Sequence, residues 1–476
     1  MALILIIVPL CLAITAFLVP WDRARAWIVT FGGVVQLGLV GVALSTPDVH
    51  GLNGWLVLDP VGRVVLGFTT VLFAACAFYV PGYLAQRPTG NKRIFCTCVL
   101  AVLSILTLIT EAYHLGLMWV AIEASTLATA PLLYFNRTPR SLEAVWKYLL
   151  IGSVGIALAL LGCFFLGYAS LYAGRAPSLL LSDLVHNAPY MSRSWLHAAF
   201  ILLLVGYGTK MGLAPMHTWK PDAYGEAPGV AGTLLAGGLT SGAFLAILRI
   251  YRVCIAAGEG SFARKPMIVL GLFSMLVAGL FMAKQKDFKR MLAYSSVEHM
   301  GILVLGIGIG GAAAFGTVLH LMNNGFTKGV LFLSAGNIHR AFGSKSTDDV
   351  RGALKKVPYS GALLLAGFFA ITGTPPFGPF LSEFTIFNAA IGSGQYLIGA
   401  LFLLMLVVVF VGMGATLLSV IQGEPSPSTA KLLAPERILT VVPAIGLLAI
   451  VLMLGVYIPT PVEALLRAAA LSLEGR

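Results

Sequence analysis

The sequence predicts an all-α polytopic membrane protein of about fourteen transmembrane helices, with two inverted five-helix repeats that each contain one broken helix. Of its 476 residues, 58% are hydrophobic and only 11% are charged, and the mean hydropathy is +0.91. Apolar runs of about 20 residues, enough to cross a bilayer as a helix, recur along the whole chain. This composition excludes a soluble domain.

Each expected span is an apolar run bounded by charged or turn-forming residues. The first run has no basic residue before it, and Arg23 and Arg25 follow it, so we interpret it as a membrane span and not as a cleaved signal peptide. The expected spans are 1–20, 26–44, 61–84, 94–111, 114–136, 142–172, 195–216, 228–256, 266–284, 291–311, 313–340, 358–394, 396–421 and 438–458.

Two of these spans contain helix breakers. The span 195–216 ends in GTKMGLAPMHTWKPDAYGEAP, Gly208 to Pro228, where Pro215 closely follows a lysine at membrane depth. The span 358–394 is too long for a simple crossing and is interrupted by ITGTPPFGPF, Ile371 to Phe380. Proline removes a backbone donor and clashes with the preceding turn, so both spans should be broken helices.

The broken spans occupy equivalent places in two groups of five, each being the fourth span of its group. Such a pair indicates an internal repeat, and an odd number of spans makes the two copies inverted in the membrane. The chain therefore divides into N-terminal helices, a first repeat, a second repeat, and a last helix with a C-terminal tail: 1–93, 94–257, 262–422 and 423–476.

The charged loops predict the orientation. The net charge of +12 comes mostly from short basic loops that fall on one side, such as QRPTGNKR and KQKDFKR. The positive-inside rule makes that side cytoplasmic. Both termini should then lie outside a bacterial-type inner (plasma) membrane, and the charge indicates no nucleic-acid partner. The basic stretch Arg249 to Lys265 falls on the wrong side for this rule.

Two ionisable residues of the first repeat lie within apolar runs. Glu123 stands in the middle of HLGLMWVAIEASTLATAPLLYF, and Lys210 stands just before the first helix break. Charge is costly in hydrocarbon, so we expect the two to pair and to exchange protons as their hydration changes. The alternative is a static ion pair that fixes helix packing. His217, just past Pro215, either passes protons to Lys210 or forms a loop hydrogen bond.

In the second repeat, His320, Asn324 and Lys328 share one face of a span because they are spaced by four residues. Polar groups on one stripe of a membrane helix indicate a hydrated path inside the protein. The alternative is hydrogen bonding between helices, which explains His320 and Asn324 better than it explains Lys328.

Three further side chains complete the candidate pathway. Glu298 and His299 fall about two turns into a span, but as sequence neighbours they point to different faces, so only one is expected to line the path. Glu383 follows the second helix break, and we expect it to exchange protons with the outer half of the membrane. The stretch Asp287 to Arg290 is predicted to be a solvated loop.

The sequence has no motif for a cofactor. It contains no GxGxxG after a strand, no P-loop, no CxxC set and no paired-histidine haem arrangement. Its six cysteines are scattered, and the one close pair, Cys96 and Cys98, has no further ligands nearby. We expect no cofactor, metal or catalytic residue in this chain, so the energy must come from an ion gradient or from partner subunits.

Five motifs, in this order, resemble one family: WVAIEASTL, GTKMGLAPMHTWKPDAYGEAP, DFKRMLAYSSVEHMG, HLMNNGFTKGVLFL and TPPFGPFLSEF. They are similar to the antiporter-like membrane subunits of respiratory complex I, Mrp-type antiporters and membrane-bound hydrogenases. YSSVEHMG and TPPFGPFLSEF most resemble the F-type subunits of hydrogenase-4 and formate hydrogenlyase complexes. The resemblance implies fourteen helices, with two inverted repeats that each contain one broken helix.

The resemblance also implies roles for residues already singled out. Glu123 and Lys210 match the family's charge pair. His320 and Lys328 match its central hydrophilic axis, and Glu383 matches the ionisable residue of the second broken helix.

The chain departs from the family pattern at two positions. Asn324 stands where some members have a second histidine, and Ser241 stands about where others have a lysine or histidine. Water would have to fill both gaps in a proton path. The chain also ends soon after its last span, without the long lateral helix of the most distal complex I subunit, which favours an inner or single antiporter-like subunit.

Three functions follow as hypotheses. The first is a proton-translocating subunit of a redox-driven complex, of the hydrogenase-4 and formate hydrogenlyase or NADH:quinone oxidoreductase type, with other membrane and soluble subunits as partners. The second is a subunit of a cation/proton antiporter that exchanges sodium ions. The third is a membrane scaffold whose buried charges only hold helices together.

Overall fold

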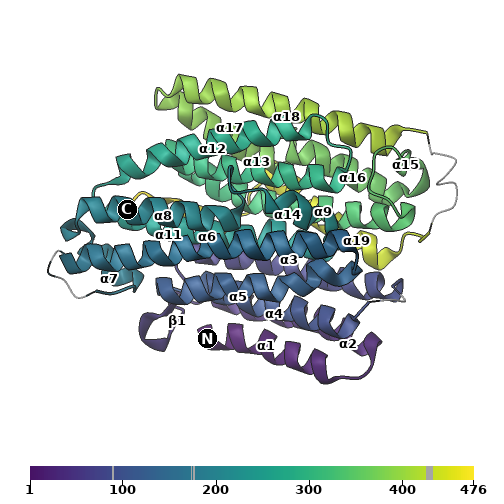
Figure 1. Cartoon of the computed structure of the whole chain (residues 1–476), viewed down its shortest axis with the longest axis horizontal. Coiled ribbons are helices and arrows are strands. Elements are labelled where there is room, and N and C mark those ends of the chain that lie inside the picture. The colour runs from purple at the N-terminus through teal and green to yellow at the C-terminus, as the bar shows by residue number, and fades with distance from the viewer. Residues whose placement is uncertain (88–89, 173, 175–176, 425–432, 476) are drawn as a thin grey trace.

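The computed structural model describes residues 1–87, 90–172, 174, 177–424 and 433–475. Its helices run mostly along one direction and form an elongated bundle (Figure 1). Within the described residues the sheet structure is confined to one small hairpin. The all-α class is thus confirmed.

The N-terminal part contains three long helices and the hairpin. The hairpin pairs His50 with Val57 and Gly51 with Leu56. It was not predicted, because strands of two residues are too short to show an alternating pattern. The elements are α1 (Ala2–Leu18), α2 (Asp22–Ser45), β1 (His50–Gly51), η1 (Leu52–Gly54), β2 (Leu56–Val57) and α3 (Pro60–Ala85).

The first repeat holds the first broken helix, formed by α8 and α9. Its last span, Gly229–Ala256, is continuous and includes a π-helical turn, η4. The elements are α4 (Lys92–Glu111), α5 (Leu115–Leu133), η2 (Tyr134–Asn136), α6 (Pro139–Tyr172), α7 (Leu181–Asn187), η3 (Ala188–Tyr190), α8 (Arg193–Met211), α9 (Trp219–Glu226), α10 (Gly229–Thr233), η4 (Leu234–Leu239) and α11 (Thr240–Ala256).

The second repeat holds the second broken helix, formed by α16 and α17, and two helices follow it. The elements are α12 (Gly260–Met282), α13 (Phe288–Ile309), α14 (Ala313–Phe342), α15 (Ala353–Lys356), α16 (Pro358–Ile371), α17 (Gly378–Gly392), α18 (Tyr396–Gln422), α19 (Ile438–Val456) and α20 (Thr460–Leu473).

Both predicted helix breaks are confirmed. After α8, Gly212 adopts a left-handed conformation with φ of 82°, and the chain becomes helical again only at Trp219. After α16, Gly373 has φ of 65°, and α17 begins at Gly378. Glycine adopts positive φ without the steric cost that a Cβ atom brings, which explains why a glycine stands at each break.

Ten helices in the described part of the chain are long and apolar enough to cross a membrane. Two others, α1 and α16, are apolar but shorter. The expected total of about fourteen crossings stays a prediction.

The centre of the bundle is formed by α13 and α14. α13 packs against α12, α14 and α9, and α14 packs against α16, α17 and α19. Every residue in the apolar window of α13 is buried. The ionisable side chains in the middle of these two helices, Glu298, His299, His320 and Lys328, therefore lie inside the protein and not against lipid.

The C-terminal part contains a helix that was not predicted. α20 buries Leu466, Ala469 and Leu473, and it packs against α3 and α14. Beside this buried face stand Glu463 and Arg467, which form an exposed ion pair. The mixture of charged and apolar residues hid this helix from a search for apolar runs, so the predicted tail is in fact helical.

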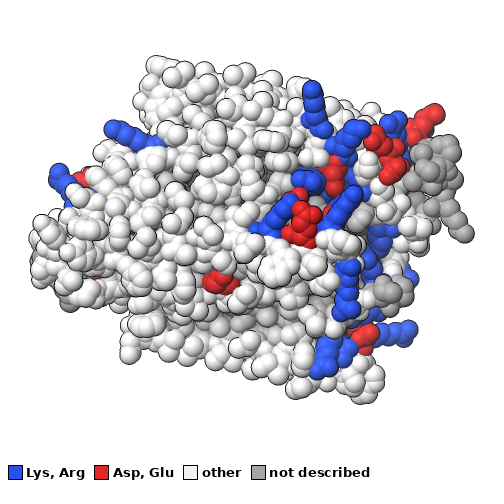
Figure 2. Space-filling model, in the orientation of Figure 1, with Lys and Arg blue, Asp and Glu red and all other residues white. Residues whose placement is uncertain are grey.

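Most of the charged side chains on the face in view gather at the end of the bundle where α15 lies, and the rest of that face has few of them (Figure 2). The basic stretch from Arg249 has a different explanation. Arg249 and Arg252 belong to α11, and both bind Asp59, at 2.8 Å and 3.1 Å. Asp59 offsets part of their charge inside the fold, so these two arginines are not free loop charges of the kind that the positive-inside rule counts.

Candidate functional site

The first part of the site is the predicted pair of Glu123 and Lys210. Nζ of Lys210, on α8, lies 2.9 Å from Oε2 of Glu123, on α5. Nζ also donates to Oγ1 of Thr126, and Oγ of Ser153 donates to Oε1 of Glu123 at 3.4 Å. A Cβ atom at Gly152 would lie 3.0 Å from this ammonium, so a glycine lets α6 pass beside it.

The two partners differ in exposure. The side chain of Lys210 is 7% exposed and that of Glu123 is 23% exposed. Val120 and Leu127, near Glu123 on α5, are largely exposed. The carboxylate therefore reaches toward the lateral surface of the bundle, while the ammonium lies inside.

The second part of the site is a histidine pair between α13 and α14. Nδ1 of His299 lies 3.0 Å from Nε2 of His320, and Nδ1 of His320 lies 2.9 Å from Oγ of Ser382. Both histidines are fully buried. A neutral imidazole donates through one nitrogen and accepts through the other, so this row can pass a proton by exchanging tautomers.

The structure places Glu298 and His299 in contact, although as sequence neighbours they were expected to point to different faces; which of them lines a proton path stays a prediction. Both are buried, and Oε2 of Glu298 lies 3.6 Å from Nε2 of His299. Backbone direction alone misleads here, because the carboxylate is on a flexible chain that can bend toward the neighbouring ring.

Lys328 is fully buried, and its Nζ donates to Oγ of Ser295 at 2.8 Å. The side-chain amides of Asn323 and Asn324 are also buried, and within the described residues all four of their polar atoms lack a hydrogen-bond partner. Buried polar atoms of this kind are usually satisfied by ordered water. This part of α14 is thus polar on more than one face.

Glu383 lies on α17 and is buried, with Oε1 unpartnered among the described residues. His299, His320 and Glu383 each offer one ligand atom, and these atoms lie within 4.8 Å of one another. Two histidines and a carboxylate are a ligand set that zinc uses. The cluster has the chemistry to hold either protons or a divalent metal ion, although no metal was predicted.

His217 is buried between α8 and α9, where its ring centroid lies 6.1 Å from that of Tyr294. No hydrogen bond joins it to Lys210 among the described residues. The structure thus brings together Glu123 with Lys210, and Glu298, His299, His320 and Glu383 with one another, but it leaves His217 apart.

Two buried lysines were missed. Nζ of Lys220, on α9, donates to the carbonyl oxygens of Met211 at 2.8 Å and Ser296 at 3.3 Å. Nζ of Lys289, on α13, donates to those of Gly225 at 3.0 Å and Ala227 at 2.6 Å. Burial of Lys289 corrects the prediction of a solvated loop at this point. For Lys220, the only sequence signal of burial was its position between Pro215 and Pro221, directly after the first broken span.

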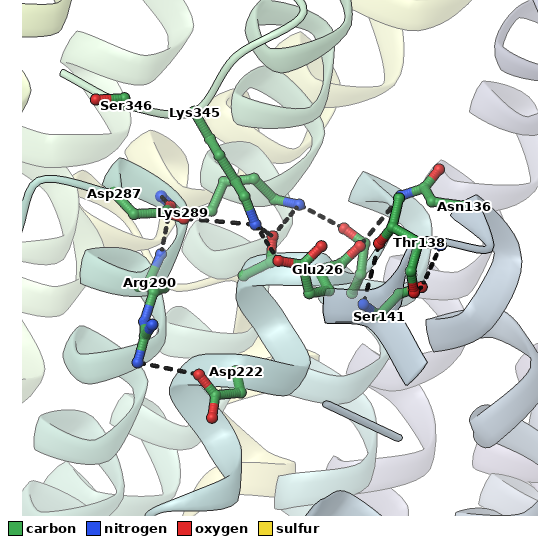
Figure 3. Close-up of polar contacts among 12 residues, drawn as sticks. Asn136, Thr138, Ser141, Asp222, Glu226, Asp287, Lys289, Arg290, Lys345 and Ser346 are labelled. Atoms are coloured by element: carbon green, nitrogen blue, oxygen red, sulfur yellow. Dashed lines mark hydrogen bonds and ion pairs between the residues drawn. The ribbon is translucent and has the colours of Figure 1, made fainter. Parts of the chain in front are cut away.

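The charged end of the site is a network that holds α9 to α13 (Figure 3). Lys345 binds Glu226 at 2.5 Å and Asp287 at 3.4 Å, and Arg290 binds Asp222 at 3.0 Å. Two polar hollows of about 550 Å³ and 520 Å³ flank this network, and both are lined by Arg140, Glu226 and Lys345. These hollows lie at the Glu226 end of α9, where Lys289 binds, and not at the other end, where Lys220 stands.

The fold and the site define a class of protein. A helical bundle with two broken helices, and with buried ionisable residues beside both breaks, is the architecture of membrane proteins that move ions.

Comparisons with known proteins agree. Residues 112–414 match the family described as "NADH:quinone oxidoreductase/Mrp antiporter, TM". The chain is 35% identical over 401 residues to a hydrogenase-4 component F homolog of Methylacidiphilum infernorum, covering 83% of this chain and 82% of the relative. It is 30% identical over 413 residues to NADH-quinone oxidoreductase subunit N of Desulforudis audaxviator, covering 83% and 81%.

Solved structures share the fold. A subunit of an archaeal membrane-bound sulfane sulfur reductase superposes with a TM-score of 0.88 at 22% identity, covering 99% of this chain and 97% of the other. A chain of the Mrp complex from Dietzia sp. gives 0.85 at 19%, covering 99% and 96%. The chain therefore belongs to the NADH:quinone oxidoreductase/Mrp antiporter family of membrane subunits.

Proposed function

We propose that this chain moves protons across the membrane as one subunit of a multi-subunit redox complex. The observation that carries the proposal is the set of ionisable side chains inside the bundle, which includes the part-exposed Glu123 and the buried Lys210, beside the first helix break, and the buried Glu383, beside the second. The similarity to a hydrogenase-4 component F homolog and to an NADH-quinone oxidoreductase subunit supports a redox-driven partner.

The geometry supplies a mechanism for each half. In the first repeat, separation of Glu123 from Lys210 removes the counter-charge that keeps the lysine protonated, so the lysine releases a proton. In the second repeat, protons pass along His299 and His320 and reach Glu383, whose carboxylate lies beside them. Electron transfer in partner subunits supplies the energy, and this chain supplies the path.

A second candidate is a subunit of a cation/proton antiporter. The observation that favours it is a set of buried oxygen atoms without partners among the described residues, on Asn323, Asn324 and Glu383. Oxygen ligands suit hard cations such as sodium. The fold shared with the Mrp complex is consistent with this alternative.

We also propose a bacterial-type plasma membrane as the location, with the charged end of the bundle in the cytoplasm and both termini outside. The gathering of lysine and arginine at one end supports this orientation. The partners would be further membrane subunits along the lateral faces and soluble redox subunits at the cytoplasmic end.

The test is proton movement by the intact complex, purified with its native partner subunits and reconstituted in vesicles that contain a pH-sensitive dye. Addition of an electron donor that its soluble subunits oxidise should drive a pH change in sodium-free buffer, and an uncoupler should abolish it. Redox turnover without any pH change would favour the scaffold. A pH change driven by a sodium gradient, without a donor, would favour the antiporter.

A further inference from the structure

Lys220 lies where the two repeats meet. Its ammonium donates to the carbonyl oxygen of Met211, the residue directly after Lys210, and to that of Ser296. Ser296 directly follows Ser295, whose hydroxyl binds the ammonium of Lys328. Lys220 thus contacts two places: the end of α8, the helix to which Lys210 belongs, and the turn of α13 whose Ser295 binds Lys328 of α14.

Lys220 has no acidic partner. It is 0% exposed, and no carboxylate lies within ion-pair distance of it in the part of the chain that the structure describes. The charged or titratable groups that act on it electrostatically are bases: Lys328, His299 and His217. A buried ammonium held only by carbonyl oxygens is costly, and a second positive charge at Lys328 raises that cost. A positive charge on one of these two lysines therefore disfavours a positive charge on the other.

The local backbone makes room for this side chain. A Cβ atom at Gly212 would lie 2.6 Å from Cδ of Lys220 and 3.0 Å from its Nζ. Gly212 also has φ of 82°. The glycine at the helix break therefore serves two purposes, since it ends α8 and it admits the lysine to the α8 terminus, where carbonyl groups favour a cation.

The surroundings of Lys220 are polar enough to hold water. Oγ of Ser296 and the hydroxyl of Tyr224 are buried near one another, and neither forms a hydrogen bond of good geometry among the described residues. The Tyr224 ring lies 5.5 Å from Nζ of Lys220. Buried hydroxyls of this kind are commonly satisfied by ordered water. Such water could also carry a proton between lysine side chains that are not in direct contact.

We propose that Lys220 is a proton carrier that connects the two halves of the path. This inference rests on the proposed function. In each step one N–H bond breaks and one forms: the Lys210 ammonium gives a proton to the neutral Lys220 amine, and the resulting Lys220 ammonium gives one to the neutral Lys328 amine. The total charge stays constant, and only its position changes.

The test uses the intact complex in vesicles and compares protons moved per electron. Lys220→Met keeps the length of the side chain but carries no proton, and we expect this ratio to fall about tenfold or more. Lys289→Met is the matched control, because Lys289 is equally buried and also bound to two carbonyl oxygens. The control should keep most of its translocation.

Lys220→His separates transport from structure and decides the question if Lys220→Met does not assemble. Histidine has an ordinary pKa of about 6.5 against about 10.4 for lysine. A proton carrier at this position should therefore move the pH profile of translocation to lower pH. A side chain that only caps α8 would leave the profile unchanged, and that result would overturn the proposal.

Lys210→Ala distinguishes the two levels of inference. If the wild type moves no protons, the proposed function fails. If the wild type moves protons and Lys210→Ala does not, but Lys220→Met matches the wild type, only the role of Lys220 fails. An equal loss in Lys220→Met and Lys289→Met would also refute it, because the effect would then be common to buried lysines.

Discussion

At the scale of single residues, Lys210 can have either of two roles: a fixed positive charge or a proton carrier. Lys210 is held by one carboxylate and one hydroxyl, in an otherwise apolar setting. A scaffold needs only the positive charge of this side chain, whereas a relay needs it to release a proton. The two requirements lead to opposite expectations for one substitution.

Lys210→Arg keeps the charge and the reach, but arginine does not release its proton in proteins. We expect translocation by the assembled complex to fall about a hundredfold, to the level of Lys210→Ala. The measurement is dye-detected proton uptake, normalised to complex on a native gel. Arginine with wild-type activity would exclude Lys210 as a carrier.

Glu123→Gln removes the counter-charge and keeps the shape. Because Lys210 then lacks its partner, we expect about a tenfold loss of protons moved per electron, with assembly intact. Glu143→Gln is the control, since its carboxylate is exposed and pairs with Lys147 one helical turn away. Equal and normal ratios in both variants would make the Glu123 pair structural.

At the scale of elements, one buried ion pair ties α3 to α11. Asp59 binds both Arg249 and Arg252, and Arg249 is 1% exposed. Removal of one partner of a buried pair leaves an uncompensated charge, which is more costly than the loss of an exposed pair.

Asp59→Ala should therefore lower the free energy of unfolding by about 3 kcal/mol. A thermal stability assay on the purified protein in detergent checks this value. Glu463→Ala, which breaks the exposed pair with Arg467 on α20, should change stability by no more than about 0.5 kcal/mol. Similar shifts in the two variants would show that the Asp59 pair is not a structural tie.

The sequence foretells these elements to different extents. The helix breaks were predictable because glycine and proline end a helix through their own backbone geometry, whatever the tertiary fold. Gly212, Gly373 and the prolines beside them are examples. The contact between Glu298 and His299 was not, because it depends on how the side chains bend inside the bundle. Lys220 was also hidden, since its burial depends on the space above Gly212 and not on its own neighbours in sequence.

At the scale of the whole molecule, the uneven distribution of charge implies a fixed orientation in the membrane. Lysine and arginine gather at the end where α15 lies (Figure 2). Transfer of that end across the membrane would be costly, so it should stay in the cytoplasm.

Fusions of a reporter that is active only outside the cytoplasm check the orientation. We expect activity for fusions near Gly51 and after the last residue, Arg476, and no activity near Arg351. A reporter that is silent after Arg476 but active near Gly51 would mean that the number of crossings differs by one.

The complete enclosure of α13 has a consequence for biogenesis. A helix that carries Glu298 and His299 gains less from entering lipid alone than its apolar residues would give, because each ionisable group at the bilayer centre disfavours insertion. In the mature fold α12 packs along α13 and shields part of it. We expect the two to enter the membrane together as a hairpin, so the apolar sequence of α12 would determine how efficiently the polar helix beside it is inserted during synthesis.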